Sequence, residues 1–261
     1  NTVDLVVIGQ FAGSMALAAV GATTTLVNLV VNAMVNFTVG ATVCVANQIG
    51  ARNDDGVRCA THTAFTVGLA AGAGLAVVLI AGAEGFLRLM QTPEEILGQS
   101  VLYIRIYGLG LPAISLYNFG AAVCRGAGDS KRPLYILTAS GVLNAALNLV
   151  LVICFHWDVA GVAAATSVAN YAAAIAMTIF LCHAHDARRL SVRHLGVHGP
   201  TLRRICRIGF PALAQSCLFN IANIAVQASV NTLGATVVAG NSACSSVENF
   251  AYTGTNAIGQ S

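Results

Sequence analysis

The sequence predicts an all-α protein that crosses a membrane several times, and three observations support this fold class. Charged residues make up 9% of the 261 residues, far below the roughly 25% of soluble domains. Hydrophobic residues make up 56%, and the mean hydropathy is +0.75. Long stretches lack Asp, Glu, Lys and Arg, and each has at least the roughly 17–25 residues that a membrane helix needs. These stretches are 5–51, 59–83, 106–124, 133–157, 159–185 and 208–247.

Turn signals divide the first half of the chain into four expected helices. The first, 1–12, ends at the small-residue turn FAGS near residue 13. The second, 15–50, is one apolar run that stops at the polar turn ARNDDG. The third, 58–87, precedes the proline turn MQTPEE, and the fourth, 96–124, stops at RGAGDSKRP. Gly, Pro and charged residues in these turns are typical of helix ends.

Four further helices are expected in the second half. The helix 132–155 ends at HWD, and 159–183 ends where the polar segment HAHDARRLSVRHLGVHGPTLRR begins. The last two are 202–232 and 235–261. The first and last helices are truncated and the chain has no initiating Met, so we expect an internal fragment of a longer protein.

The basic residues indicate how these helices are oriented. If successive connections alternate sides, 11 of the 13 Lys and Arg residues fall on one side, and only Arg88 and Arg105 fall on the other. Cytoplasmic loops of membrane proteins carry the excess of Lys and Arg. We therefore expect the basic side to be cytoplasmic and residue 1 to start there.

A basic linker and a weak internal repeat predict two halves. Asn1 aligns with Asn220, Gly21 with Gly240 and Gly40 with Gly259, and the second copy begins just after the polar segment. Transporters often consist of two such repeats, with the substrate path between them. The expected domains are a six-helix N-terminal lobe (1–183), a basic cytoplasmic linker (184–201) and the start of a C-terminal lobe (202–261).

Two carboxylates lie within or beside apolar stretches. Asp4 is either a solvated helix-end carboxylate or a buried acid that titrates or binds a cation, because a lone buried charge is costly. Glu248 is alone in the last expected helix, where it either faces the substrate cavity or pairs with a helix outside this chain.

Amides and a hydroxyl form two further groups. Asn144 and Asn148 are four residues apart, so they share one helical face, and Thr166 follows in the next expected helix. Their oxygens suit a hard monovalent cation such as Na⁺ or a carboxyl group that gains and loses a proton, but spacing alone favours hydrogen bonds between helices.

A second group of amides lies nearer the start of the chain. Asn28, Asn32 and Asn36 form a stripe along one face of the second expected helix. Three amides on one face rarely face lipid, so this stripe lines either a helix contact or a wet substrate cavity.

The sequence shows no sign of a soluble enzyme. RGAGD lacks the Lys-Ser/Thr pair of a phosphate loop, and no Ser/His/Asp set falls at one depth. We expect no enzymatic activity, no resident cofactor and no nucleic-acid partner.

Several motifs in order along the whole chain are similar to one family of transporters. The segments NTVD, VGATVCVANQIGA, QTPEEI, YIRIYGLGLP, RGAGDSKRP, NAALN and GVAAATSVA resemble the multidrug and toxic compound extrusion (MATE) family, most closely its bacterial DinF-like branch. The resemblance implies a fold of twelve helices in two six-helix lobes. This chain would then hold the N-lobe and the first two helices of the C-lobe.

The resemblance also implies an activity and a cation site. Members of the family export cationic or amphipathic compounds in exchange for H⁺ or Na⁺. By position, Asp4, Asn144 and Thr166 match the family's cation-site residues, whereas Asn148 stands where many relatives carry Asp. That departure leaves the coupling ion open.

We therefore expect a multi-pass efflux transporter in a bacterial cytoplasmic membrane, with drug-like cations as substrates and a monomeric state. The first alternative is a flippase of lipid-linked oligosaccharides or polyisoprenoids from the same superfamily. The second, less favoured, is a membrane-embedded enzyme.

Overall fold

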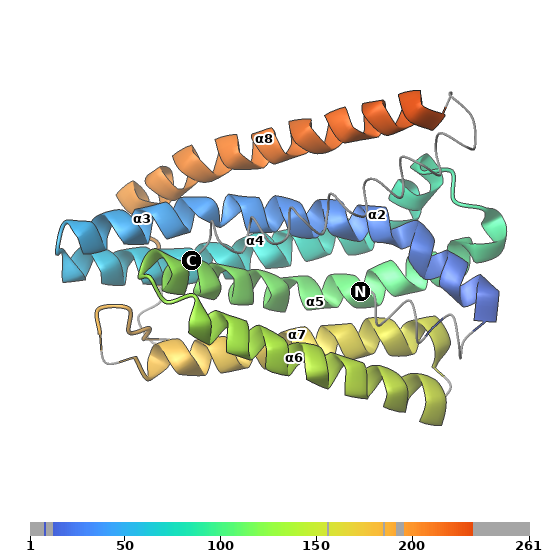
Figure 1. Ribbon diagram of the computed structural model, residues 1–261, viewed down its shortest axis with the longest axis horizontal. Helices are drawn as coiled ribbons and strands as arrows, with labels where there is room; N and C mark the ends of the chain where they lie inside the picture. The colour runs from blue at the N-terminus through green and yellow to red at the C-terminus, as the bar shows by residue number, and fades with distance from the viewer. Residues whose placement is uncertain (1–7, 9–12, 156, 185, 192–195, 232–261) are drawn as a thin grey trace.

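The structure is a computed structural model that describes residues 8, 13–155, 157–184, 186–191 and 196–231. Its described helices run nearly side by side along the length of the molecule (Figure 1). In chain order they are α2 (Gly13–Phe37), α3 (Val39–Gly50), α4 (Asp54–Leu89), α5 (Glu94–Gly126), α6 (Lys131–Leu149), the π-helical turn η1 (Val150–Cys154), α7 (Asp158–Cys182) and α8 (Gly199–Asn231).

The all-α membrane class is confirmed, and the expected spans agree with the helices. Within the described residues, five segments are long and apolar enough to cross a membrane: Met15–Gly50, Asp54–Leu89, Glu94–Gly126, Lys131–Cys154 and Asp158–Cys182. The predicted helix 202–232 corresponds to α8. The predicted helices 1–12 and 235–261 lie outside the described residues, apart from Ile8.

Local chemistry at the turns explains where α4 and α5 begin. The Asn53 side chain accepts a hydrogen bond of 3.0 Å from the Gly56 backbone N–H, which caps the start of α4. Asp54 and Asp55 follow in its first turn, where negative charge favours the helix dipole. Pro93 precedes α5, whose first turn contains Glu94 and Glu95. These residues lie at the starts of the two helices, outside their apolar middles.

Helix α5 lies at the centre of the bundle and packs most extensively against α4 and α7. Glycines on α4 allow the close approach. A Cβ atom at Gly72 would lie 2.7 Å from the Ser115 Cβ and 2.8 Å from the Pro112 Cα of α5. One turn away, the Ser115 hydroxyl donates a 2.6 Å hydrogen bond to the Gly68 carbonyl. Gly68 and Gly72 therefore allow α4 to pack closely against α5.

Replacing Gly72 with alanine is expected to lower the free energy of unfolding by about 1–3 kcal/mol, because the added methyl group meets the α5 backbone. Gly74, two residues along the same helix, has nothing within 4 Å of a Cβ atom and gives a matched control. Gly74→Ala should be neutral or stabilise the helix by up to about 1 kcal/mol. Thermal unfolding of the detergent-solubilised protein measures both variants, and equal midpoints would contradict the packing argument.

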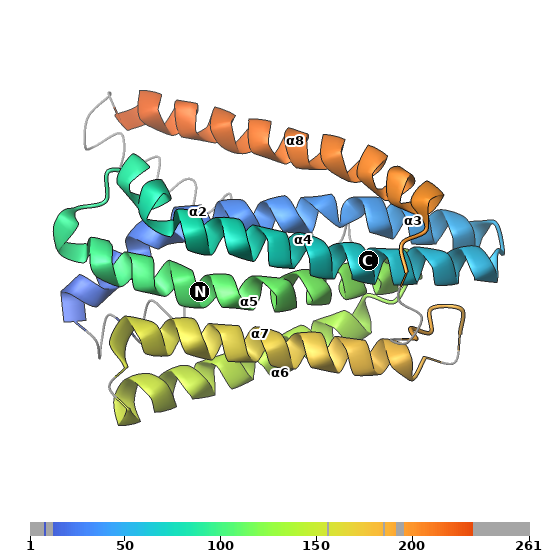
Figure 2. The same ribbon diagram turned by 180° about the vertical axis from the view of Figure 1, so that it is seen from behind.

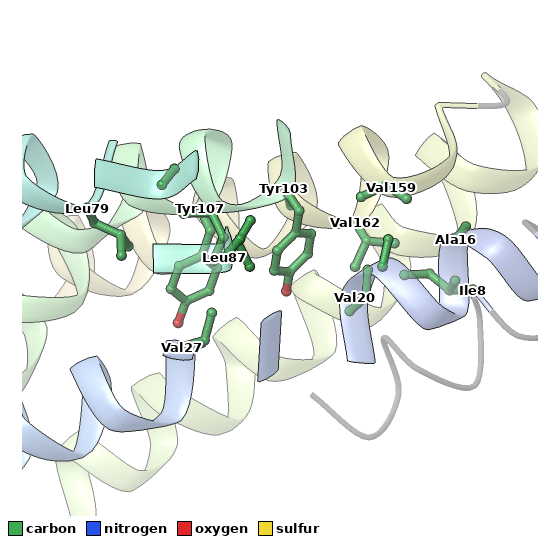
Figure 3. Close-up of a cluster of buried hydrophobic side chains, with 14 of the residues drawn as sticks. Ile8, Ala16, Val20, Val27, Leu79, Leu87, Tyr103, Tyr107, Val159 and Val162 are labelled. Carbon is green, nitrogen blue, oxygen red and sulfur yellow. The ribbon is translucent and has the colours of Figure 1, made fainter. Parts of the chain in front are cut away.

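Two clusters of buried apolar side chains hold the helices together. One cluster lies inside the half of the bundle that contains the start of α2 and the start of α5. Figure 3 shows part of this cluster. There Tyr103 and Tyr107 of α5 stack with ring centroids 6.0 Å apart. In Figure 3 their rings extend toward α2, with Tyr107 close to Val27. The other cluster joins α3, α4, α5 and α7 near the opposite end, around Phe119 and Met177.

The connection between α7 and α8 folds back onto the bundle. Arg188 forms ion pairs with Asp186 and, at 3.5 Å, with Asp129 in the α5–α6 loop. The hydrogen bond from Arg188 holds the pKa of the Asp186 carboxyl below its ordinary value. Leu190 is 2% exposed and belongs to the second apolar cluster. This part of the linker therefore packs against the helices of the expected N-lobe.

Helix α8 packs along α2 and α3, on one side of the bundle in both views (Figures 1 and 2). The contact is close at two glycines near the junction of α2 and α3. A Cβ atom at Gly40 would collide with the Ile205 carbonyl, and one at Gly209 would lie 2.7 Å from the Phe37 carbonyl oxygen. The first helix after the linker is thus in backbone contact with the helix that precedes α4.

Candidate functional site

A cavity of about 460 Å³ lies between α2, α5, α6 and α7. Its wall mixes apolar side chains with amides, hydroxyls and two tyrosines. The lining residues are Asn28, Val31, Val35, Tyr107, Ile114, Tyr117, Asn118, Leu137, Ser140, Gly141, Asn144, Thr166, Ala169 and Asn170. Each of the four helices contributes one asparagine. Because the wall combines α2 with α5, α6 and α7, which come much later in the chain, the cavity exists only once the bundle has formed.

Three of the four predicted cation-site residues are described: Asn144 and Thr166 lie in this wall, and Asn148 is hydrogen-bonded to Asn144. Asn148 is fully buried, and its side-chain N–H donates to the side-chain carbonyl oxygen of Asn144 at 2.9 Å. The Asn144 side-chain N–H in turn donates to the Thr166 hydroxyl oxygen at 3.1 Å. The result is a continuous amide chain, Asn148 to Asn144 to Thr166, that joins α6 to α7. The structure therefore joins Thr166 to the Asn144–Asn148 pair, a contact that sequence spacing could not establish.

The amide chain sits where the backbone of α6 changes its winding. Immediately after Leu149, the helix becomes the π-helical turn η1. Such π-helical turns are rare and occur frequently at functional sites. Nearby, the Ser140 hydroxyl of α6 donates a 2.8 Å hydrogen bond to the Ala169 carbonyl of α7. Polar side chains thus connect α6 and α7 at two levels, both adjoining the cavity.

Asn148 differs chemically from a carboxylate at the same position. Its amide donates a hydrogen bond to Asn144, which an ionised aspartate has no N–H to make. As a result, the Asn144 carbonyl oxygen already has a donor, and the Thr166 oxygen accepts from Asn144. A cation bound at these two oxygens would share each of them with a hydrogen bond within the protein.

The asparagine stripe on α2 divides between two environments. Asn28 is exposed to the cavity and lines its wall. Asn36 donates a 2.9 Å hydrogen bond to the Ser216 hydroxyl of α8, so it forms a helix contact. Asn32 is exposed and is not among the lining residues, although its backbone carbonyl accepts from the Asn36 side chain at 2.8 Å. One end of the stripe therefore lines a cavity and the other end forms a helix contact, and a role in substrate binding stays a prediction.

Sequence reasoning missed several cavity residues. Asn118 and Asn170 line the wall, together with the phenol side chains of Tyr107 and Tyr117. The Asn118 side-chain N–H donates to the Ile114 carbonyl of its own helix at 2.8 Å. The sequence does contain a signal for them, because both asparagines are polar residues within long charge-free stretches, as Asn28 is. Asn170 also lies four residues after Thr166 on the same face of α7, whereas Asn118 has no polar neighbour four residues away in α5.

The lining residues include no Asp, Glu, Lys, Arg or His. Asp4 and Glu248, the two acids expected near the path, lie outside the described residues. The described wall therefore offers neutral hydrogen-bonding groups and aromatic faces. Such a wall recognises a ligand mainly by shape, apolar contact and amide hydrogen bonds, with cation–π contacts available from the tyrosines.

Comparison with known proteins gives one family. The family model described as MatE matches residues 1–150. The chain is 30% identical over 244 residues to the probable multidrug resistance protein YoeA of Bacillus subtilis, covering 91% of this chain and 53% of that protein. It is 23% identical to the multidrug export protein MepA of Staphylococcus aureus strain NCTC 8325, covering 72% of this chain and 42% of that protein. The chain thus spans about half the length of the curated relatives it matches.

Solved structures share the fold. A crystal structure of MATE in the bent conformation superposes with a TM-score of 0.85 at 22% identity, covering 91% of this chain and 53% of that one. An outward-facing multidrug resistance MATE transporter gives 0.82 at 23% identity, with 92% and 53% covered. At these identities the similarity concerns the fold alone.

Proposed function

This chain belongs to the MatE family, and from that premise we propose that the full-length protein is a secondary active efflux transporter. It would export cationic or amphipathic compounds across a bacterial cytoplasmic membrane in exchange for an inward-moving ion. Its relatives include proteins named for multidrug resistance and multidrug export. Like the family, the chain is multi-pass and belongs among transporters, not enzymes. Its assignment to the DinF-like branch and its monomeric state stay predictions.

One observation carries this proposal: the cavity between α2, α5, α6 and α7 is in contact with the amide chain. Asn144 and Thr166 belong to both features. A change of charge or hydrogen bonding at the amide chain therefore alters the wall of the cavity directly. Coupled transport requires such a link, because an ion shifts a conformational equilibrium only through its different affinity for the two states.

The coupling ion that fits the described residues better is a proton. The side-chain oxygens of Asn144 and Thr166 each already accept one hydrogen bond, which leaves one lone pair on each for Na⁺. A carboxyl group that gains and loses a proton needs only one new hydrogen bond at the end of the chain. We assign that carboxyl to Asp4, which matches the family's acid by position and lies outside the described residues.

The lobe division expected from the sequence is part of this proposal. The N-terminal lobe would comprise 1–183, the linker 184–201, and 202–261 would begin the second lobe. The substrate site would then lie within the first lobe and open between the lobes, and rocking of the lobes would expose it to each side in turn. A flippase of pyrophosphate-linked lipids fits less well, because the cavity lining contains no Lys or Arg.

Transport by the full-length protein in proteoliposomes tests the proposal. A fluorescent cation is loaded, and a pH gradient and a Na⁺ gradient are imposed separately. We expect efflux with the pH gradient alone and no response to Na⁺ alone. Efflux driven only by Na⁺ would reject the proton assignment, and movement of a lipid-linked pyrophosphate with no cation efflux would reject the transporter class.

The two ends of the asparagine stripe should behave differently when each is replaced by leucine. Asn28→Leu removes an amide from the cavity wall, so KM should change for some compounds and not others, by about 3–10-fold, while the unfolding midpoint stays constant. Asn36→Leu removes the contact with Ser216 and should lower the unfolding midpoint, with KM changed equally for all compounds. The same substrate profile in both variants would contradict the division.

A further inference from the structure

Arg105 is a charged residue within a membrane span. It lies in α5, a helix of 33 residues and therefore about 50 Å long, whereas the hydrocarbon core of a bilayer is about 30 Å thick. If α5 is centred in the bilayer, Arg105 lies about 7 Å inside the nearer hydrocarbon edge. Its side chain is exposed. Within the described part of the chain, the ion pairs involve Arg88, Arg132 and Arg188 and do not include Arg105.

Helical geometry turns Arg105 away from the substrate cavity. Positions 105, 109, 112 and 116 share one face of α5, whereas the cavity residues Tyr107, Ile114 and Asn118 lie about half a turn away. Leu102 and Leu109 flank Arg105 and are 47% and 59% exposed. The guanidinium group therefore lies on an apolar outer surface, where an unpartnered charge is costly.

An apolar groove lies about two turns farther along the face of α5 that carries Arg105. It has a volume of about 230 Å³ and lies between α4, α5 and α7, which run side by side in Figure 2. Its wall includes Leu69, Pro112, Leu116, Ile175 and Ile179. Both hydroxyl groups in the wall already donate hydrogen bonds to the backbone. Tyr171 donates to the Leu109 carbonyl at 2.8 Å, and Thr178 donates to the Ala174 carbonyl at 2.7 Å.

The arginine and the groove follow one another in the same order as the phosphate and the acyl chains of a phospholipid. Side chains on a helix lean toward its N-terminus, so the guanidinium leans toward the Glu94 end of α5. The distribution of basic residues places this end on the extracytoplasmic side. The positive charge therefore lies outward, and the groove lies deeper, toward the middle of the bilayer. An outer-leaflet phospholipid has its phosphate and acyl chains in this order.

We propose that Arg105 and the groove between α4, α5 and α7 bind one phospholipid of the outer leaflet. The guanidinium binds the phosphate, for which its planar fork of N–H donors is well suited. One acyl chain lies along Leu109 and in the groove. This inference does not depend on the proposed function, because the lipid site and the substrate cavity lie on opposite faces of α5.

Photolabelling of the full-length protein in phosphatidylglycerol and phosphatidylcholine vesicles tests the site. The probe is a phospholipid with a photoactivatable acyl chain, and peptide mass spectrometry locates the label. We expect labelling concentrated on the peptides that contain Leu116, Ile175 and Ile179. Arg105→Gln should reduce this labelling about tenfold, the loss expected for one charge-assisted pair, and Arg105→Lys should retain most of it.

Two controls separate the phosphate contact from general exposure to lipid. Arg88→Gln removes an exposed arginine that pairs with Glu84 and Glu94 outside this face, and it should leave the labelling unchanged. A diacylglycerol probe with the same acyl chain but no phosphate should label wild-type protein as weakly as the phospholipid labels Arg105→Gln. This second comparison uses wild-type protein only, so it decides the matter even if the variant does not fold.

Three results would overturn the proposal. Equal labelling of the wild type and Arg105→Gln would show that the arginine does not hold the phosphate. Equal labelling by the two probes would show that the phosphate contributes nothing. Label spread evenly over all the helices, or absent from the groove peptides because other parts of the chain cover them, would show that the groove is not a lipid site.

Discussion

Replacing Asn144 with leucine is expected to reduce ion-driven efflux at least tenfold in proteoliposomes. Asn144 is the middle member of the amide chain, since it accepts from Asn148 and donates to Thr166. Leucine would break both hydrogen bonds and leave the buried Asn148 amide without this acceptor. Each polar group left without a partner costs about 1–3 kcal/mol, and about 1.4 kcal/mol corresponds to a tenfold change. We expect substrate binding without a gradient to change much less than the driven rate.

A matched control lies on the same helix. Thr138 of α6 is exposed, and its hydroxyl donates to the Leu134 carbonyl of its own helix at 2.9 Å. Thr138→Val should leave both efflux and the unfolding midpoint unchanged. Asn144→Leu at full efflux rate would show that the amide chain is only a helix contact. A loss of efflux that follows the unfolding midpoint across several Asn144 variants would lead to the same conclusion.

The spans themselves follow from the sequence because a membrane helix requires a long apolar stretch without charged residues. Helices α4, α5, α6 and α7 each contain a charge-free run bounded by Asp, Glu, Arg or Lys, so composition alone located them. The break between α2 and α3 at Thr38 was not predicted. There the Thr38 hydroxyl donates to the Val35 carbonyl at 2.7 Å, a local competition with helical hydrogen bonding that does not interrupt the apolar pattern.

The candidate site was predictable only in part, because it is assembled by packing between distant helices. Asn144 and Asn148 could be paired from their spacing within α6, but their connection to Thr166 depends on how α6 meets α7. Asn28 shares a cavity with Asn144 although the two lie on helices with several others between them in sequence. Sequence spacing carries no information on such contacts.

A hydrogen-bonded helix contact and a cation site are therefore not mutually exclusive roles for these residues. Asn144 and Thr166 form a hydrogen bond between helices and also line the cavity. Under the proposed function, this hydrogen bond would stabilise the packing in one conformation and become accessible to an ion or a carboxyl group in another. The same side chains would then serve stability in one state and coupling in the other.

Replacing Asp4 with asparagine should abolish gradient-driven efflux while leaving binding of the exported cation measurable. The proposal assigns to Asp4 the proton that moves inward, and an amide holds no exchangeable charge over the physiological pH range. Without that charge, the two conformations no longer differ in proton affinity, so a pH gradient does no work on the equilibrium. We expect the driven rate to fall by about 100-fold or more, the effect of removing roughly 2.7 kcal/mol of coupling.

The matched control for Asp4 is an acid outside the site, and a second variant tests the role of position 148. Glu84→Gln removes an exposed carboxylate that pairs with Arg88 and should leave efflux unchanged. Asn148→Asp replaces the donor of the amide chain by a carboxylate, which frees the Asn144 oxygen and adds negative charge. This variant should gain a response to Na⁺ that the wild type lacks. Two results would contradict this assignment: efflux driven by a pH gradient in Asp4→Asn, or no response to Na⁺ in Asn148→Asp. Either result would mean that the ion does not act through these residues and that coupling lies elsewhere in the protein.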